Sequence, residues 1–266
     1  MSVTSTIVDR AEIRFHVAAP ELQPYVGCFW VITAQRGATV RAVPDGTTSI
    51  SIELQGEHGF EGYLRGPMLR PLELRFGAPA TVLGVRLRPG VAFMLSGVPA
   101  HSIADQRTRL EDCAAFSEFA SLEPVPRTCT QWIAVLQKFL IDRLDGATFH
   151  PVVERALAAI HAEQGSIPVA DIAARCGSSE RHLGRLMRDW IGYGAKRYSG
   201  IVRFQAALMQ MESAPSLPFA TLASQIGYFD QAHLSVDVAR YAGATPGHLK
   251  SEHVADFSKT RCDVPF

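Results

Sequence analysis

Apolar and polar residues alternate in short runs over the first part of the chain, up to about residue 110. The clearest run is 48–54, Thr-Ser-Ile-Ser-Ile-Glu-Leu, and a period of two places its apolar side chains on one face of a strand. Turn signals such as Pro44-Asp45-Gly46 separate the runs, because proline fixes φ and glycine permits a positive φ. Other strands are expected near 7–17, 30–33, 39–43, 60–64, 72–76 and 80–87. Many short strands at this spacing predict a small β-barrel or sandwich.

The apolar spacing changes after Arg88-Pro89-Gly90 to three and four residues, which predicts helices. Short helices are expected at 91–95 and 110–119, followed by a proline-containing linker at 122–127. Residues 130–144 form an amphipathic pattern. Its apolar face would either join two copies of the chain or pack on the chain's own barrel.

From His150 onward the apolar spacing is helical, and the pattern of helix, glycine-led turn and helix occurs twice. Helices are expected at 151–160, 169–176, 179–190, 195–211 and 219–226, with a last one after Asp230. Asp230 is a good N-cap because its carboxylate can accept a backbone N–H of the first turn, and Gly243 with Pro246 ends that helix. Each repeat predicts a helix-turn-helix unit. The tail after Lys250 has no clear periodicity and is expected to be loose.

The composition is that of a globular protein, with 47% hydrophobic and 20% charged residues among 266, enough for two domains. No apolar run is long enough for a membrane span, and the N-terminus has no signal-peptide pattern. The five cysteines form no C-x-x-C pair, which argues against a disulfide or zinc framework. We therefore expect a reducing, cytoplasmic location.

The net charge is zero, but the charges are unevenly distributed along the helical part. Residues 168–203 contain seven basic and three acidic residues, a net charge of +4. Residues 204–249 contain one basic and three acidic residues, a net charge of −2. A phosphate-binding surface is therefore expected on the first helix-turn-helix unit.

The second helix of each unit carries the candidate DNA contacts. Arg181 and Arg185 are assigned to base edges, because arginine can donate two hydrogen bonds to guanine in the major groove. Gln231 and Ala232 are assigned to bases at the start of the other recognition helix. The expected contacts to the DNA backbone are Ser179, Arg188, Lys196, Arg197, His233 and Ser235. The arginines could instead form a solvated helix face, but the duplicated motif favours DNA.

Several motifs carry a resemblance to a known family. They are Val169-x-x-Ile172-Ala173, Ser179-x-x-x-Leu183-x-Arg185, Gly192, Arg203-Phe204-Gln205, Leu222-Ala223, 227–233 (Gly-Tyr-Phe-Asp-Gln-Ala-His) and Gly243-x-Thr245-Pro246. With them, residues 150–250 resemble the DNA-binding domain of AraC/XylS-type regulators. The resemblance implies seven helices, with a long one joining two helix-turn-helix units. Residues 43–46 and 83–90 resemble N-terminal domains of one branch, for which it implies a cupin-like barrel that senses a small effector or contacts a partner.

The second recognition helix departs from the family pattern. Val236 stands where the family commonly has arginine, and Val238 stands where it has phenylalanine. Val236 cannot form a hydrogen bond or ion pair with guanine or phosphate, and Val238 fills less core volume than phenylalanine. We therefore expect the first unit to read sequence and the second to hold position.

The N-terminal half shows no catalytic or metal-binding pattern. His16, His58 and His101 form no H-x-H pair, and there is no nucleophile elbow or phosphate-binding loop, so neither an enzyme nor a cofactor or metal is expected. Cys28 is interpreted as a buried structural thiol. The candidates for an effector pocket are aromatic residues, although such residues are more often core: Tyr25, Phe29, Trp30, Tyr63 and Phe76.

The sequence thus predicts an α+β chain with a cupin-like β-barrel domain at 1–122, a linker and dimerisation helix at 123–148, a double helix-turn-helix domain at 149–252 and a tail at 253–266. The expected function is a transcription regulator that binds double-stranded DNA and responds to a small effector. RNA polymerase and a second copy of the chain are further expected partners, and a membrane is not. The alternative is a ligand- or protein-binding module whose DNA-binding half has become weak.

Overall fold

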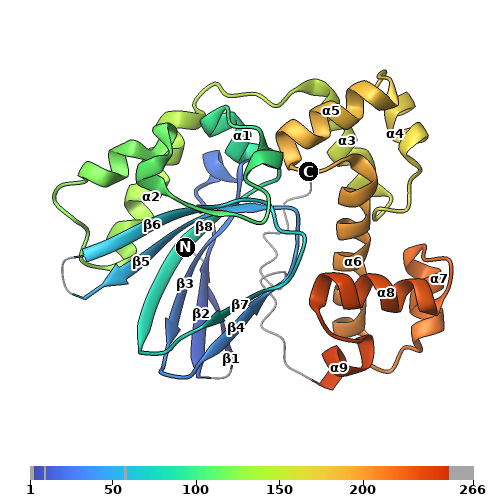
Figure 1. Cartoon of the computed structure of the whole chain (residues 1–266), viewed down its shortest axis with the longest axis horizontal. Helices are drawn as coiled ribbons and strands as arrows, with labels where there is room; N and C mark the ends of the chain where they lie inside the picture. The colour runs from blue at the N-terminus through green and yellow to red at the C-terminus, as the bar shows by residue number, and fades with distance from the viewer. Residues whose placement is uncertain (1–2, 9, 57–58, 252–266) are drawn as a thin grey trace.

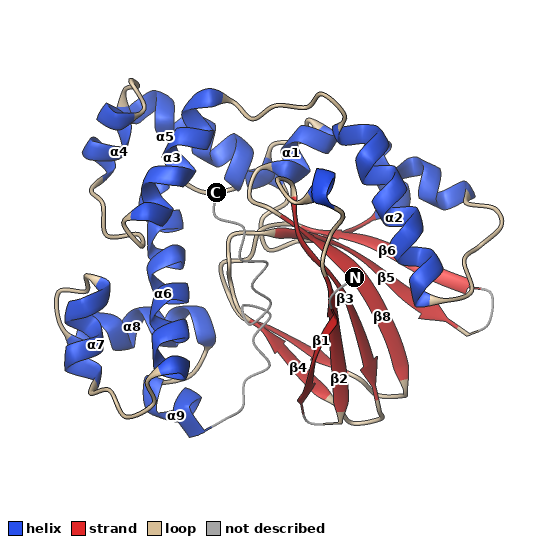
Figure 2. Ribbon diagram, turned by 180° about the vertical axis from the view of Figure 1, so that it is seen from behind, coloured by secondary structure: helices blue, strands red, loops and turns tan. Residues whose placement is uncertain are grey.

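The structure, a computed structural model, describes residues 3–8, 10–56 and 59–251. Its N-terminal part is rich in β-sheet and its C-terminal part is helical, as Figure 1 shows. Seen from behind in Figure 2, helix α2 (Cys129–Leu144) lies across one face of the large sheet. The α+β class and the order of the two parts along the chain are therefore as predicted.

The N-terminal part is built on two antiparallel sheets. The larger has the strand order β1-β2-β3-β8-β5-β6-β9, and the smaller pairs β4 with β7. The strands are β1 (Val3–Val8), β2 (Ala11–His16), β3 (Val26–Ala34), β4 (Thr39–Ala42), β5 (Thr48–Gln55), β6 (Gly59–Arg65), β7 (Leu72–Arg75), β8 (Ala80–Leu87) and β9 (Arg107–Arg109). Among the described residues, β4 and β7 bond only to each other, and the edges β1 and β9 stay open. The two sheets form stacked layers, and closure into the predicted barrel is not shown in these residues, since closure requires continuous strand pairing.

Each face of the large sheet has its own core. Successive side chains of a strand point to opposite faces, so the neighbours Phe29 and Trp30 enter different cores. Phe29 packs in the core under α2, whose Trp132 is fully buried. Trp30 packs between the two sheets with Val40 and with Cys28, which is buried as the sequence indicated.

Helix α2 uses its apolar face within its own chain. The buried residues of that face join the core on the large sheet: Trp132, Ile133, Leu136, Phe139, Leu140 and Leu144. Of the two roles that the sequence left open, the structure supports packing on the chain's own sheet. The dimerisation role of this helix stays a prediction, and its apolar face is covered within the chain.

The other N-terminal elements are short. They are the 3-10 turns η1 (Pro20–Leu22), η2 (Ala100–Ser102), η3 (Leu110–Asp112) and η4 (Ala114–Ser121) and the helix α1 (Val91–Ser96). The α-helix predicted at 110–119 is thus 3-10 in conformation. The strand predicted at 7–17 is a hairpin of β1 and β2, with Arg10 at a φ of 64° in its turn. Strand β9 was not predicted, because three residues are too few to show alternation.

The C-terminal part shares one core that runs through all its helices. They are α3 (Pro151–Ala162), α4 (Val169–Arg175), α5 (Glu180–Ile191), α6 (Ala195–Ser213), α7 (Phe219–Ile226), α8 (Gln231–Ala242) and α9 (Pro246–Ser251). The helices predicted before residue 227 are present, with ends within two residues of the prediction. Helix α9 reaches only the first residue, Ser251, of the tail after Lys250 that was expected to be loose, and residues 252–266 lie outside the described residues.

The two parts are packed against each other. Val43, from the loop after β4, belongs to the core of the helical part. The rings of Phe93 in α1 and Trp190 in α5 lie 4.9 Å apart, and Trp190 also faces Phe149. The N-terminal part therefore contacts a recognition helix directly.

Candidate functional site

The first helix-turn-helix unit consists of α4, the turn at 176–179 and α5. Gly177 adopts a φ of 63° in the turn, and the Ser179 hydroxyl caps α5 by accepting the His182 N–H at 3.2 Å. Ile172 on α4 and Leu183 on α5 are fully buried where the helices cross. This packing fixes the rotation of α5 and decides which side chains face outward.

The outward face of α5 is basic. Arg181, Arg185 and Arg188 are exposed, and Lys196 and Arg197 are exposed at the start of α6. Arg185 Nη2 lies 3.3 Å from His182 Nδ1. His182 was not predicted as a site residue, although its spacing of three from Arg185 puts both on one helix face.

The second unit consists of α7, the turn at 227–230 and α8. Asp230 Oδ1 accepts the His233 N–H at 2.7 Å, which is the predicted N-cap. Gln231, Ala232 and His233 are exposed, as expected for groove contacts. Ser235 is only partly exposed, and its hydroxyl donates to the Gln231 carbonyl at 2.8 Å. The hydroxyl hydrogen of Ser235 is therefore engaged within the helix.

The charge counted from sequence is partly buried at the joint between α6 and α8. Asp237 is 6% exposed and lies within 4.0 Å of Arg203, His233 and Arg240 nitrogens. Arg203 also covers the Tyr228 ring at 4.8 Å. One acid of the second unit and one base of the joining helix α6 thus hold these helices together, and the contrast in exposed charge between the two units is smaller than the sequence suggested.

The exposed side of α8 carries apolar side chains. Val236 is 59% exposed and Phe229, in the turn, is 91% exposed. Ala232 precedes Val236 by one helical turn and is also exposed, so the two share a face. Val238, the other departure from the family pattern, is fully buried beside the buried Leu234.

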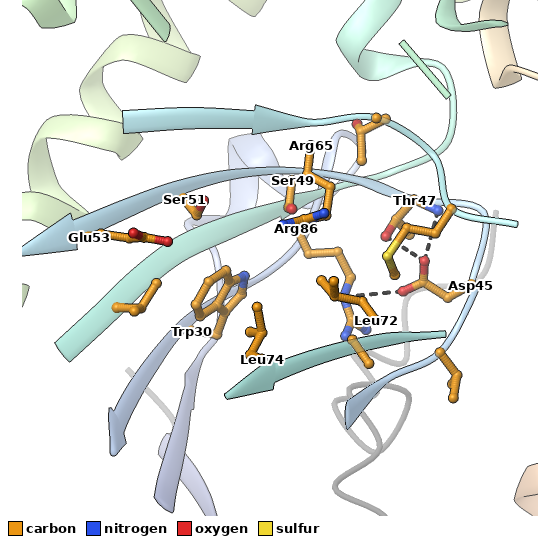
Figure 3. Close-up of a pocket in the computed structure, with 16 residues that line it drawn as sticks. Trp30, Asp45, Thr47, Ser49, Ser51, Glu53, Arg65, Leu72, Leu74 and Arg86 are labelled. Atoms are coloured by element: carbon orange, nitrogen blue, oxygen red, sulfur yellow. Dashed lines mark hydrogen bonds and ion pairs between the residues drawn. The ribbon is translucent and has the colours of Figure 1, made fainter. Parts of the chain in front are cut away.

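A pocket lies between the large sheet and the β4–β7 sheet (Figure 3). Its empty space, counting the part open to solvent, is about 690 Å³. The lining residues named in Figure 3 are Trp30, Asp45, Thr47, Ser49, Ser51, Glu53, Arg65, Leu72, Leu74 and Arg86. The pocket is polar along β5 and apolar where Trp30 and Leu74 lie.

Of the five aromatic candidates, Trp30 is the one that lines this pocket. Phe29 points to the other face, and Tyr25 donates from there to the Ala147 carbonyl at 2.7 Å. The Tyr63 ring is covered by the Arg107 guanidinium, 3.3 Å from its centroid. Phe76 packs against the core between the sheets. The polar lining was not predicted, although the polar positions of the run at 48–54 mark the face of β5 that is not covered by α2.

The loop between β4 and β5, which lines the pocket, touches the helical part. Gln205 Nε2 of α6 donates to the Pro44 carbonyl at 2.6 Å. Gly46 lies so close to Tyr198 that an added Cβ would be 2.5 Å from its ring. Tyr198 is fully buried, and its hydroxyl lies 2.8 Å from His161 Nε2. Burial, with a further contribution from a nearby arginine, lowers the pKa of His161 to about 4.

The loop between β6 and β7 reaches the ends of both recognition helices. Helix α5 ends at Gly192 and α8 ends at Gly243, both with positive φ. A Cβ added to Gly192 would lie 2.5 Å from Cγ of Pro67, and one added to Gly243 would lie 3.1 Å from Cγ of Pro71. One loop of the N-terminal part thus contacts both helix-turn-helix units.

Within the described ranges, no group of three or more His, Cys, Asp or Glu side chains is placed to hold a metal ion. No helix in the same part of the chain has the length and hydropathy needed to span a membrane.

The comparisons with known proteins fall on the same two parts. Residues 172–252 match a family described as a helix-turn-helix domain, and residues 14–109 match a domain of unknown function (DUF6597). A protein of Streptomyces antibioticus whose name describes it as an AraC-like transcription regulator is 28% identical over 130 residues. The alignment covers 48% of this chain and 39% of that protein, so the chain spans about two fifths of the length of this curated relative.

Two solved structures are similar at low identity. The C-terminal domain of AraT, a response regulator from Geobacillus stearothermophilus, is 21% identical with a TM-score of 0.37, over 40% of this chain and 88% of that chain. ToxT from Vibrio cholerae is 10% identical with a TM-score of 0.45, over 84% of this chain and 97% of that chain. The family match at 172–252 and the AraC-like relative agree with the motifs at 227–233 and 243–246, so the C-terminal part of this chain is a helix-turn-helix domain similar to that of AraC-like regulators.

Proposed function

We propose that this protein is a sequence-specific transcription regulator that binds double-stranded DNA and whose N-terminal part responds to a small effector. The observation that supports DNA binding best is the pair of capped recognition helices, α5 and α8, joined by the single helix α6. Two such helices can enter successive major grooves, about 34 Å apart along B-form DNA.

The proposed DNA contacts are side chains that the two units expose fully or in part. Arg181 and Arg185 are the proposed base contacts of the first unit, and Arg188, Lys196, Arg197 and Ser179 are its proposed phosphate contacts. Gln231 and Ala232 are the proposed base contacts of the second unit, with His233 and Ser235 near the backbone. All are exposed except Ser235, which is partly exposed.

The effector role rests on the contacts between the two parts. The pocket is bounded by loops that touch α6 and the ends of α5 and α8. A ligand that binds one arrangement of these loops better than another shifts the population of DNA-binding geometries. RNA polymerase as a partner, a homodimer through a surface other than the covered face of α2, and a cytoplasmic location remain parts of the proposal.

The function is tested by a gel-shift selection of genomic fragments with the full chain at two salt concentrations. We expect fragments that share a site, with affinity that falls steeply as salt rises because counterions are released from the phosphates. Failure to retain any fragment at low salt would overturn the proposal.

A second function is favoured by one observation. The exposed Val236 and Phe229 give α8 an apolar surface where the family commonly has arginine. In that case the chain would be a ligand- or protein-binding module with a weak DNA-binding half. The same selection separates the two functions, since such a module would retain fragments without a common sequence or not at all.

A further inference from the structure

The floor of the pocket is a grid of side chains on three neighbouring strands. Ser49 of β5 pairs with Arg65 of β6 on one side and with Arg86 of β8 on the other. Paired residues point to the same face, and adjacent strands lie about 4.8 Å apart, so the two arginine backbones are roughly 10 Å apart across Ser49. Figure 3 shows both arginine side chains in the same pocket with Ser49.

Of the arginines that line the pocket, one has no ion-pair partner among the described residues. Arg86 Nε lies 3.4 Å from Asp45 Oδ2, and Glu53 forms an ion pair with Arg107 from outside the pocket. Arg65 makes no ion pair in the part of the chain that the structure describes. Burial and the neighbouring Arg107 lower the pKa of Arg65, while Glu53 acts in the opposite direction, so its charge is only partly compensated. A single negative charge on a ligand would compensate it.

The other end of the pocket is apolar. In the next row of the grid, Ser51 pairs with Gly84, which in turn pairs with Trp30. A Cβ on Gly84 would lie 2.7 Å from the Trp30 ring, so the lack of a side chain at Gly84 leaves room for the indole. Leu72 and Leu74 of β7 close the pocket from the small sheet. This end suits an apolar or aromatic group of a ligand.

Asp45 connects the basic end to the helical part. Its Oδ1 accepts from the Thr47 N–H at 2.9 Å and the Thr47 hydroxyl at 2.6 Å, while its Oδ2 faces Arg86. The residues on either side, Pro44 and Gly46, are those that contact Gln205 and Tyr198 of α6. The Asp45–Arg86 pair therefore ties the loop that touches α6 to the floor of the pocket.

Resting on the regulator function proposed above, we propose that the pocket binds a small organic monoanion, with its acidic group between Arg65 and Arg86 and its apolar part along Trp30 and Leu74. The acidic group competes with Asp45 for Arg86. Binding thereby loosens the hold of β8 on the loop at 43–47, and this changes the contact of that loop with α6 and the DNA affinity of the two units.

Ligand class is tested by calorimetric titration of the full chain with octanoate and 3-phenylpropionate, beside the neutral 1-octanol and 3-phenylpropan-1-ol and inorganic phosphate. We expect the two carboxylates to bind about tenfold or more tightly than their alcohols, as a charge-assisted contact implies. Phosphate should bind more weakly than either, because it has no apolar part. Equal affinity for acids and alcohols, or no binding of either acid at millimolar concentration, would overturn the proposal.

Matched variants assign the site. Arg65→Gln should weaken carboxylate binding about tenfold or more. Arg75→Gln removes the same charge from an exposed arginine of β7 that does not line the pocket, and it should leave the affinity unchanged. If both variants bind the carboxylates as the unchanged chain does, the acidic group does not sit at Arg65.

The coupling is tested with Asp45→Asn, whose amide oxygen still accepts from Thr47. This variant should bind the carboxylates several-fold more tightly, because the competitor for Arg86 is gone. Its DNA affinity should match that of the carboxylate-bound unchanged chain and no longer respond to the probes. If the DNA affinity of Asp45→Asn still responded to the carboxylates as that of the unchanged chain does, the proposed competition between ligand and Asp45 for Arg86 would be wrong. If no sample bound DNA while the carboxylates still bound the protein, the result would count against the regulator function alone.

Discussion

Gln205 Nε2 lies 2.6 Å from the carbonyl oxygen of Pro44, which joins the N-terminal part to the helix between the two helix-turn-helix units. Both residues belong to motifs that resemble the same family but stand 161 positions apart in the chain. The structure gives these motifs a common physical role: Pro44-Asp45-Gly46 forms the turn that contacts α6, and Arg86 of the second N-terminal motif pairs with Asp45.

Gln205→Met should lower the free energy of unfolding by about 1–3 kcal/mol, because it leaves the buried Pro44 carbonyl without a donor while keeping the length of the side chain. Urea unfolding measures this. Gln210→Met, on the same helix but facing α7, is the control and should stay within about 0.5 kcal/mol, since its site is exposed. Equal effects of the two substitutions would mean that the Gln205 contact does not stabilise the joint.

Arg181→Ala and Arg185→Ala should each weaken binding to the selected DNA site by about 1–3 kcal/mol and relax the preference at one base pair. Lys196→Ala should weaken binding to all sequences similarly and lower the salt slope by about one. Arg175→Ala is the control, because Arg175 is not on the recognition helix and its guanidinium lies 3.0 Å from the Glu163 carboxylate. Fluorescence anisotropy at several salt concentrations measures these effects, and an unchanged preference in both recognition-helix variants would contradict the assignment.

Helices α5, α7 and α8 of the C-terminal part could be predicted because the sequence marks their ends. Ser179 and Asp230 are N-caps in the structure, and Gly192, Gly227 and Gly243 end helices with positive φ. The pocket could not be predicted in the same way. Phe29 and Trp30 are adjacent in sequence, and only the tertiary structure shows which face of β3 the small sheet covers.

The distribution of charge along the sequence did not predict which charged side chains are exposed, because that also depends on the tertiary structure. Arg203 and Asp237 counted toward opposite charges of the two units, yet both are turned inward at the joint of α6 and α8. Arg65 and Arg86, which the sequence argument did not select, lie in the pocket because the polar positions of β6 and β8 share a face with those of β5. Tertiary contacts decide both outcomes: the packing of α6 against α8 in the first case and the pairing of strands in the second.

Stability should fall below pH 6.5 because of His161. Burial depresses the pKa of this residue in the folded state to about 4, whereas the unfolded chain takes up the proton near the ordinary value of 6.5. The unfolded state therefore binds more protons between these values, and the stabilisation present above pH 6.5 is lost as the pH falls to 4. The total is roughly 3 kcal/mol. Urea unfolding at pH 7.5 and pH 5 measures the difference, and His161→Gln should reduce it while the exposed His248→Gln should not.

Two glycines with positive φ provide a matched test of packing. A Cβ on Gly165 would lie 2.1 Å from the Ser199 carbonyl oxygen of α6, whereas nothing lies within 4 Å of one on Gly177. Gly177→Ala should cost about 1 kcal/mol, from backbone conformation alone. Gly165→Ala should cost several kcal/mol more, because backbone atoms must move apart. Thermal unfolding of the two variants gives the comparison, and similar melting temperatures would show that α3 and α6 separate easily.

Val236 should make the second unit sensitive to thymine methyl groups. An exposed valine on a recognition helix gains free energy in the major groove only from an apolar surface, and the thymine C5-methyl is the apolar group there. Replacing the thymines of the second half-site by deoxyuracil removes the methyl groups and keeps every hydrogen bond of the base pair. We expect this replacement to weaken binding of the unchanged chain by about 1 kcal/mol per contacted methyl, and to have little effect on Val236→Ser. Uracil in the first half-site is the control, because α5 presents arginines there. Equal sensitivity of both half-sites, or of the unchanged chain and Val236→Ser, would show that Val236 does not contact a base.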